Sequence, residues 1–402
     1  MQRLGFLKHL VARASQTSTS NLRALGDNLI KTVSSKVSVS ATPSLEKYLS
    51  AILSGISHQA LMSRVRNALE QSTVGGTVSV ELQDAYLSSD TLPSRRGRLV
   101  PYDWQKYPHL AVRLGLLREN SFSPLVRGQV FLALVSPAEL AAFREYSENT
   151  NPFILTVEQR IFFLFTFLER DEHVLLPLYR ALLPLETEFT EWEAGNLMPK
   201  IFGEIYQSFR PIARSGADTV RLQSLLETAK VIERWRDKRY SGKGARDDAA
   251  TLRVEPFVDI GILTKEDPFS YRYHFTPTGR QLMSALTKAE KGEPGLDSGF
   301  FASVSEAFNL SAPPIQDPDK LLDLIYPSFV KLASPLGYAP MREVILLAAI
   351  SATTTGRGCF ELADGYEALK DAQREYPELV RFNVDRWGNP IFVKFLSDPV
   401  RS

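Results

Sequence analysis

The chain has 402 residues, of which 44% are hydrophobic and 23% charged, and its formal net charge is +1. These values are typical of a globular chain with two or three domains; they exclude general disorder, and no apolar run reaches the roughly 20 residues that a membrane-spanning helix needs. The single cysteine, Cys359, cannot form an intrachain disulfide, which indicates a reducing compartment, and we expect a cytoplasmic protein.

The N-terminal segment, residues 1–43, has two interpretations. Its first 26 residues contain four basic side chains and no acid, and they are rich in Ser and Thr, which is typical of a mitochondrial transit peptide. The same residues also have the spacing of an amphipathic helix, with an apolar side formed by Leu4, Leu7, Leu10 and Val11. Under the second interpretation the helix is followed by a loosely packed, Ser/Thr-rich stretch.

A first domain is predicted over residues 44–147. Helices are expected near 45–55 and 58–71, and Gly75 and Gly76 then break the helical pattern. Residues 77–82 alternate between apolar and polar side chains, as a short strand does.

A second domain is predicted over residues 151–288. Thr156 is a good N-cap for an apolar helix at 157–168, whose four phenylalanines are expected in the core. Further helices are predicted at 174–183, 191–208 and 219–239, with a kink or split at Pro199. Because no hairpin strand follows the first helix until residue 271, we expect one domain at 154–286 that is interrupted by a helical insertion near 186–247.

A Pro-, Gly- and charge-rich stretch at 289–317 is predicted to be a linker to a C-terminal domain, 318–402. That domain has the patterns of helices at 318–332, 340–352 and 361–375. It ends in a predicted hairpin with strands at 380–384 and 391–396, whose turn contains Gly388 and Asn389.

Two segments of the chain are similar to each other. Residues 111–117 (AVRLGLL) match residues 257–263 (FVDIGIL), and in both a helix is expected to end at a glycine, Gly115 or Gly261. Glycine adopts the left-handed conformation of the residue after a helix at no steric cost. We therefore predict that the two glycines occupy equivalent positions, and that strands follow at 125–134 in the first copy and at 271–275 in the second.

A helix, a Gly-Leu-Leu or Gly-Ile-Leu sequence, a charged turn and a hairpin strand together resemble the closing half of a winged helix-turn-helix domain. In the second copy, residues 249–260 would be the recognition helix, although Pro256 departs from the pattern, and Thr276-Pro277-Thr278-Gly279 would begin the closing helix. The C-terminal domain resembles a third, more divergent copy. The resemblance implies a mainly α fold with small β-wings, in tandem winged-helix-like domains with a helical insertion. Many such domains bind DNA, and others make only protein contacts.

Two basic runs favour nucleic acid as the partner. Residues 95–118 contain six basic side chains and one acid, and residues 230–246 contain seven basic side chains and two acids, with Trp and Tyr interleaved. The candidate nucleic-acid-binding residues are Arg95, Arg96, Arg98, Arg113, Arg236, Lys238, Arg239, Lys243, Arg246, Arg253 and Arg272. In an alternative interpretation, Glu233, Arg236 and Asp237 pair along one helix and form only a solvated charged face.

Catalytic and metal-binding motifs are missing from the sequence. It contains no P-loop and no His-Glu-x-x-His, its five histidines are scattered, and one cysteine does not make the usual structural zinc site. Glu367 and Lys370 are expected on a helix, not at the sheet edge that a magnesium-dependent nuclease needs. We therefore predict a protein without enzymatic activity, cofactor or metal.

The leading functional hypothesis is a protein that binds double-stranded DNA, by analogy as a subunit of a bacterial defence (antiviral) or chromosome-maintenance assembly. The alternative is a protein–protein scaffold whose winged helices dock a partner enzyme or a second copy of the chain. An enzyme with an unrecognised site is a third interpretation. The first two differ in salt dependence, because phosphate contacts weaken steeply with salt and an apolar docking surface does not. No membrane partner is expected.

Overall fold

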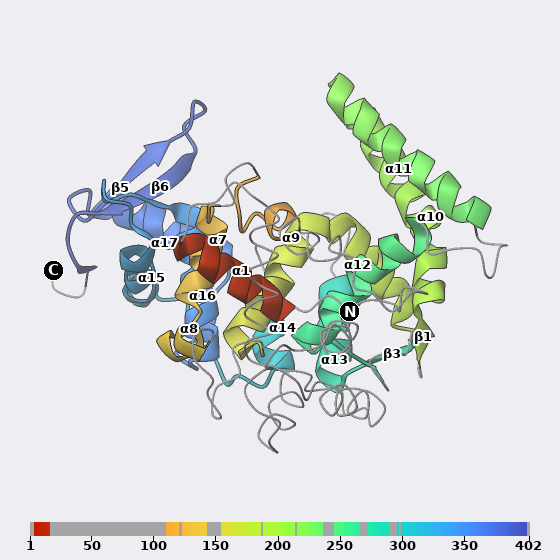
Figure 1. The fold of residues 1–402 in the computed structure, drawn as a ribbon. Helices are drawn as coiled ribbons and strands as arrows, with labels where there is room; N and C mark the ends of the chain where they lie inside the picture. Colours follow the sequence, from red (N-terminus) through yellow and green to blue (C-terminus); the bar gives the residue numbers. More distant parts are fainter. Residues whose placement is uncertain are drawn as a thin grey trace, which may run out of the picture. The chain divides into compact units, whose positions relative to one another are not determined.

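The computed structural model describes residues 4–16, 110–119, 123–142, 154–185, 188–213, 215–235, 245–265, 272–288, 296 and 299–399 (Figure 1). The helices and strand predicted between residues 45 and 82 lie outside these ranges. The chain separates into two compact units. Among the described residues, the first unit holds 164–288, and the second holds 4–16, 110–163 and 296–399.

The first unit is helical with one small sheet. Its elements are α9 (Val157–Leu182, of which the first seven residues belong to the second unit), β1 (Phe189–Thr190), α10 (Glu191–Phe209), η1 (Arg210–Ile212), α11 (Gly216–Trp235), α12 (Ala245–Ile260), β2 (Leu263–Lys265), β3 (Arg272–Phe275) and α13 (Pro277–Lys288). The sheet is antiparallel with strand order β1-β3-β2. Strand β1 was not predicted. Thr190 ends it and also caps α10, because Thr190 and Glu193 form a reciprocal capping box.

Two of the predicted helix interruptions differ from the structure. The helices predicted at 157–168 and 174–183 form the single element α9, with one non-helical residue, Asp171 (φ −141°), at a kink. Helix α10 continues through Pro199, where a kink or split was expected. The four phenylalanines of 161–167 are buried, as predicted.

The second unit also combines helices with one small sheet. Its elements are α1 (Leu4–Gln16), α7 (Val126–Ala133), α8 (Pro137–Ala142), α14 (Phe300–Ala307), α15 (Pro318–Leu332), β4 (Ala339–Pro340), α16 (Met341–Thr354), α17 (Leu362–Glu375), β5 (Val380–Val384) and β6 (Pro390–Phe395). Its antiparallel sheet has the strand order β4-β6-β5. The amphipathic first helix, the three C-terminal helices and the final hairpin are confirmed, and the boundaries of the C-terminal elements differ by at most two residues.

The structure corrects two domain assignments. Residues 289–317 were expected to be a linker, but helix α14 lies within them and buries Phe300, Phe301 and Val304. The spacing of these three apolar side chains gives a helix one apolar face, which is stabilised by packing in a core. Residues 110–142 were expected in a separate first domain, but their described parts belong to the same unit as 299–399. There the buried Arg127 of α7 pairs with Glu343 of α16 at 3.4 Å.

The two sheets share one topology. In each unit a helix is followed by a two-residue strand, further helices and a two-stranded hairpin. In each sheet the strand that comes third in the sequence, β3 or β6, lies in the centre. It pairs with the sheet's first strand on one side and with its second strand on the other. The described chain is thus mainly helical with small antiparallel three-stranded sheets, as the sequence predicted.

Gly115 and Gly261 occupy equivalent positions, which confirms the internal similarity. Their φ angles are +73° and +88°. The next residue donates its N–H five residues back in both cases, from Leu116 to Ala111 O (2.8 Å) and from Ile262 to Phe257 O (2.9 Å). This is the hydrogen bond of a Schellman motif, which satisfies a carbonyl at the end of a helix.

The element that follows Gly115 is not the predicted strand at 125–134. Leu125 does donate its N–H to Leu116 O (2.9 Å), as Thr276 does to Ile262 O (3.0 Å), but helix α7 begins at the next residue. Helices α7 and α13 are therefore equivalent. Each has glycine at its third residue, Gly128 or Gly279, and a Cβ there would lie 2.2 Å or 1.9 Å from the carbonyl oxygen of Leu116 or Ile262. Only glycine lets the helix approach the backbone this closely.

We predict that Gly279→Ala destabilises the protein by roughly 1–3 kcal/mol or more, because the helix must move away from the Ile262 carbonyl. Gly203→Ala is the matched control, since Gly203 lies within α10 and a Cβ there would meet nothing within 4 Å. It should stabilise by about 0.5–1 kcal/mol through helix propensity. Urea unfolding measures both, and equal effects of the two substitutions would contradict the close-packing argument.

A buried ion pair connects three segments of the second unit. Lys8 of α1 is 0% exposed, and its Nζ donates to Glu139 Oε1 (2.5 Å) and to the carbonyl of Ile154 (2.7 Å). The amide of Gln159 also donates to Glu139 Oε1 (3.2 Å). Burial by itself would raise the pKa of Glu139, but the Lys8 charge and the hydrogen bonds from Lys8, the Ser136 backbone and Gln159 hold that pKa below its usual value.

The depressed pKa of Glu139 makes this contribution to stability pH-dependent. Since the folded-state pKa lies below the ordinary value of about 4.3, the stabilisation is complete above that pH and is lost as pH falls through the folded-state pKa. Glu139→Gln should cost about 3–5 kcal/mol at pH 7, because Lys8 stays buried without a counter-charge. The difference from the parent protein should shrink below about pH 4.

Urea unfolding at about pH 7 and about pH 3.5 measures this dependence. The double variant Lys8→Met with Glu139→Gln should recover part of the lost stability, because no unpaired charge remains buried. A difference between parent and Glu139→Gln that stays constant with pH would contradict the assignment.

Candidate nucleic-acid interface

Helix α12 contains the predicted recognition helix, and its second half is buried. Val254, Phe257 and Ile260 are fully buried. The ring of Phe257 lies 4.8 Å from that of Tyr179, whose hydroxyl donates to the carbonyl of Arg253 (3.0 Å). The described side chains of α12 therefore pack mainly in the interior of the first unit, where they are not available to contact a ligand.

A buried carboxylate fixes α12 to the hairpin. Glu255 Oε1 accepts hydrogen bonds from Lys265 Nζ of β2 and from the hydroxyl of Tyr273 on β3, both at 2.6 Å. Burial raises the pKa of Tyr273, and the negative charge of Glu255 raises it further, so the phenol stays a neutral donor. These hydrogen bonds fix the position of the hairpin base against the helix.

Arg253 was predicted to bind nucleic acid, and the structure gives it internal partners. Its Nε lies 2.6 Å from Asp171 Oδ2, at the kink of α9, and its guanidinium lies 5.7 Å from the centre of the Phe202 ring. Its side chain is 18% exposed. Burial raises the pKa of Asp171, with Arg253 opposing that shift. Arg253 thus holds the kink of α9 to α12.

The other predicted residues are not brought together among the described residues. Arg272 begins β3, and its side chain is 58% exposed while it pairs with Glu188. Arg113 is exposed but belongs to the second unit. The side chain of Arg246 lies outside the described residues, as do Arg95, Arg96, Arg98, Arg236, Lys238, Arg239 and Lys243.

Helix α17 precedes the second hairpin, as α12 precedes the first, and its outer face is acidic. Two lysine or arginine side chains on that face are paired: Lys370 with Glu367 (2.7 Å) and Arg374 with Asp371. Asp364 caps the helix through the N–H of Glu361 (2.9 Å), and Glu375 is exposed. Four acids therefore accompany two bases on this helix, which is unfavourable for a surface that approaches phosphates.

The β5–β6 hairpin has the opposite charge, and the sequence did not single it out as a binding element. Trp387 at its tip is 70% exposed, and the Arg386 guanidinium lies 3.9 Å from the centre of its ring. Arg381 and Lys394 lie opposite each other on the two strands. The sequence 385–389 (DRWGN) contains the signal, because an aromatic and a basic residue in a hairpin turn have no core to enter.

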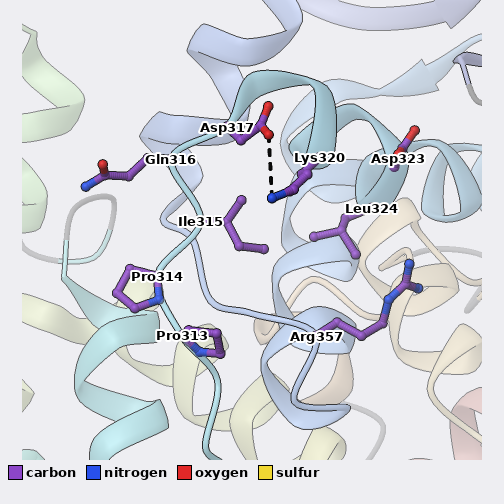
Figure 2. A pocket seen from close by; sticks show the side chains of 9 residues that line it. All are labelled: Pro313, Pro314, Ile315, Gln316, Asp317, Lys320, Asp323, Leu324 and Arg357. Atoms are coloured by element: carbon purple, nitrogen blue, oxygen red, sulfur yellow. Dashed lines mark ion pairs between the residues drawn. The ribbon is translucent and has the colours of Figure 1, made fainter.

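A pocket of about 370 Å³ lies beside the segment 313–317 of the second unit (Figure 2). Its apolar part consists of Pro313, Pro314, Ile315 and Leu324, and Lys320 pairs with Asp317 at 3.7 Å. Arg357 and Asp323 complete the charged lining. Cations and acids balance here and do not converge on one point, so the pocket has no evident charge preference for a ligand.

Metal-binding and membrane-spanning features are both missing from the described residues. In the part of the chain that the structure describes, no group of three or more His, Cys, Asp or Glu side chains is arranged to hold a metal ion. No helix there is long and apolar enough to cross a membrane. Comparisons with protein-family models, with curated proteins and with solved structures found no match to the chain.

We predict that Arg253→Ala destabilises the first unit by about 1–3 kcal/mol, because Asp171 is left without its charged partner. The folded variant should keep the DNA affinity of the parent protein, since the guanidinium is held inside. Thermal unfolding and a DNA titration below the melting temperature measure the two quantities separately. A variant with unchanged melting temperature and weakened DNA binding would reverse this assignment.

Proposed function

We propose that both units contain winged helix-turn-helix domains and that the protein binds double-stranded DNA. The observation that carries the fold proposal is the topology shared by the two sheets. In each, a helix, a short strand, further helices and a hairpin follow in that order, and the last strand lies in the centre. A winged helix has this order of elements. With α10 in the position of a second helix, α11 is the extra helix of the first unit.

The closing helices support the same assignment. Thr276 caps α13 by accepting a hydrogen bond from the N–H of Gly279 (2.9 Å), and its hydroxyl donates to the carbonyl of Gly261 (2.7 Å). The Thr-x-x-Gly sequence thus joins the left-handed glycine, the hairpin and the closing helix. Residues 110–133 repeat the second part of this arrangement with Gly115 and Gly128.

The proposal that DNA is the partner rests on positive charge. The basic runs 95–118 and 230–246 provide cationic donors for phosphates, and Arg272 is an exposed cation on a described strand. We propose that the protein acts without catalysis, as a DNA-binding subunit of a larger assembly.

A second candidate function is favoured by one observation. The outer face of α17, at the position of a recognition helix, carries four acids and two paired bases. A helix of this charge suits a protein partner better than a phosphate backbone. A scaffold whose second unit docks another protein through α17 is therefore the alternative.

Salt dependence of DNA binding tests the proposed function. The parent protein should bind a mixed-sequence duplex at about 50 mM salt and lose affinity steeply by about 200 mM. Replacing Arg239, Lys243 and Arg246 together with Ala should weaken binding at all sequences. The salt slope should flatten by about one unit for each phosphate that no longer has a cationic partner.

The matched control replaces three exposed lysines of described helices, Lys200, Lys320 and Lys331, with Ala, which removes the same charge. It should change the slope little. No binding by the parent at about 50 mM salt would refute the DNA proposal and favour the scaffold.

A further inference from the structure

We propose that the DNA-contacting element of the second unit is the β5–β6 hairpin, with Arg381, Arg386, Trp387 and Lys394, and that α17 makes no DNA contact. This inference rests on the proposed function and adds to it the surface that is used. A DNA-binding protein with this fold would be expected to use the helix, so the inference reverses that expectation for this unit.

The tip of the hairpin is preorganised. Asp385 Oδ1 accepts the N–H groups of Trp387 (2.8 Å) and Asn389 (2.9 Å), and its Oδ2 accepts the Asn389 amide (3.2 Å). Gly388 completes the turn at φ +86°. Both carboxylate oxygens of Asp385 therefore accept hydrogen bonds within the turn. Arg386 and Trp387 are exposed at the tip, with the guanidinium over the indole ring.

The positive charges on the two strands favour a polyanionic ligand. Arg381 and Lys394 are cross-strand partners, and Lys394 Nζ lies 5.1 Å from the centre of the Tyr338 ring, which positions it. Together with Arg386, three cations occupy a two-stranded ribbon. A ribbon of two strands fits the major groove of duplex DNA, and an exposed aromatic with a stacked Arg contacts sugars or bases.

Apolar side chains near the tip are also exposed. Figure 1 shows the hairpin as a two-stranded ribbon that projects from the helices of its unit. Val384 ends β5 and Ile391 is the second residue of β6, and both side chains are about half exposed. Contact with a groove would cover them beside thymine methyl groups and sugars. The acidic face of α17, in contrast, would place Glu367 and Asp371 against phosphates, where like charges repel.

Two double variants with the same change in charge test the inference. Arg381→Ala with Arg386→Ala should flatten the salt slope of duplex binding by about two units, one for each phosphate contact. Lys370→Ala with Arg374→Ala removes two exposed cations from α17 and should leave slope and affinity unchanged. Trp387→Ala should weaken binding roughly tenfold, because the contact of the indole with sugars and base edges in the groove is lost.

All substituted side chains are exposed, and circular dichroism verifies the fold of each variant. A loss of binding in the α17 variant, or unchanged slopes in the hairpin variant together with unchanged affinity of Trp387→Ala, would overturn the inference while the proposed function stands. Failure of the parent protein to bind DNA at about 50 mM salt would instead refute the proposed function. If the hairpin double variant does not fold, Trp387→Ala alone decides between hairpin and helix.

Discussion

The contact on which the repeated part of this fold depends is the approach of a helix to one backbone carbonyl. Gly261 adopts the left-handed conformation, after which the carbonyl of Ile262 points at the start of α13. Because Gly279 has no side chain, α13 can approach this carbonyl closely. The same approach recurs between Leu116 and Gly128. Because the carbonyl also accepts the N–H of the residue before each helix, one peptide group fixes the end of one helix, the strand after it and the start of the next.

Buried charges fix other elements in place. Lys8 and Glu139 join α1, α8 and the start of α9, and Glu255 joins α12 to both strands of the first hairpin. Charges buried in this way are costly unless each is paired, so they define one arrangement of their segments. The ion pair of Arg253 with Asp171 has the same effect in a partly buried setting, since it stabilises the kink of α9 and the Arg253 side chain is only 18% exposed. Basic side chains in this protein therefore divide into structural and exposed groups.

That division bears on the proposed function. The two units have the same strand order, but the helix before the hairpin differs between them in the burial and the charge of its side chains. The described side chains of α12 are largely buried, whereas the outer face of α17 is acidic and its two basic residues are paired. In the second unit the hairpin carries exposed positive charge beside an exposed tryptophan. A shared topology can thus accompany different binding surfaces, because the outer side chains contribute little to the core and vary independently of it.

The sequence alone determined the elements that have strong local patterns. The helices at 318–332 and 361–375, the final hairpin and the glycines Gly115 and Gly261 follow from apolar periodicity and turn residues, which act within a few residues of chain. The sequence did not determine that 126–133 is a helix, that 300–307 packs as a helix, or that β1 exists. A short element is stabilised by distant partners, as β1 is by β3, and not by its own propensity. Nor did it show that Arg253 has an internal partner. Arg253 is a basic residue on a predicted recognition helix, and only the tertiary structure placed an aspartate of α9 beside it, because the two residues are far apart in the sequence. The exposure of Arg386, in contrast, follows from its place in a hairpin turn.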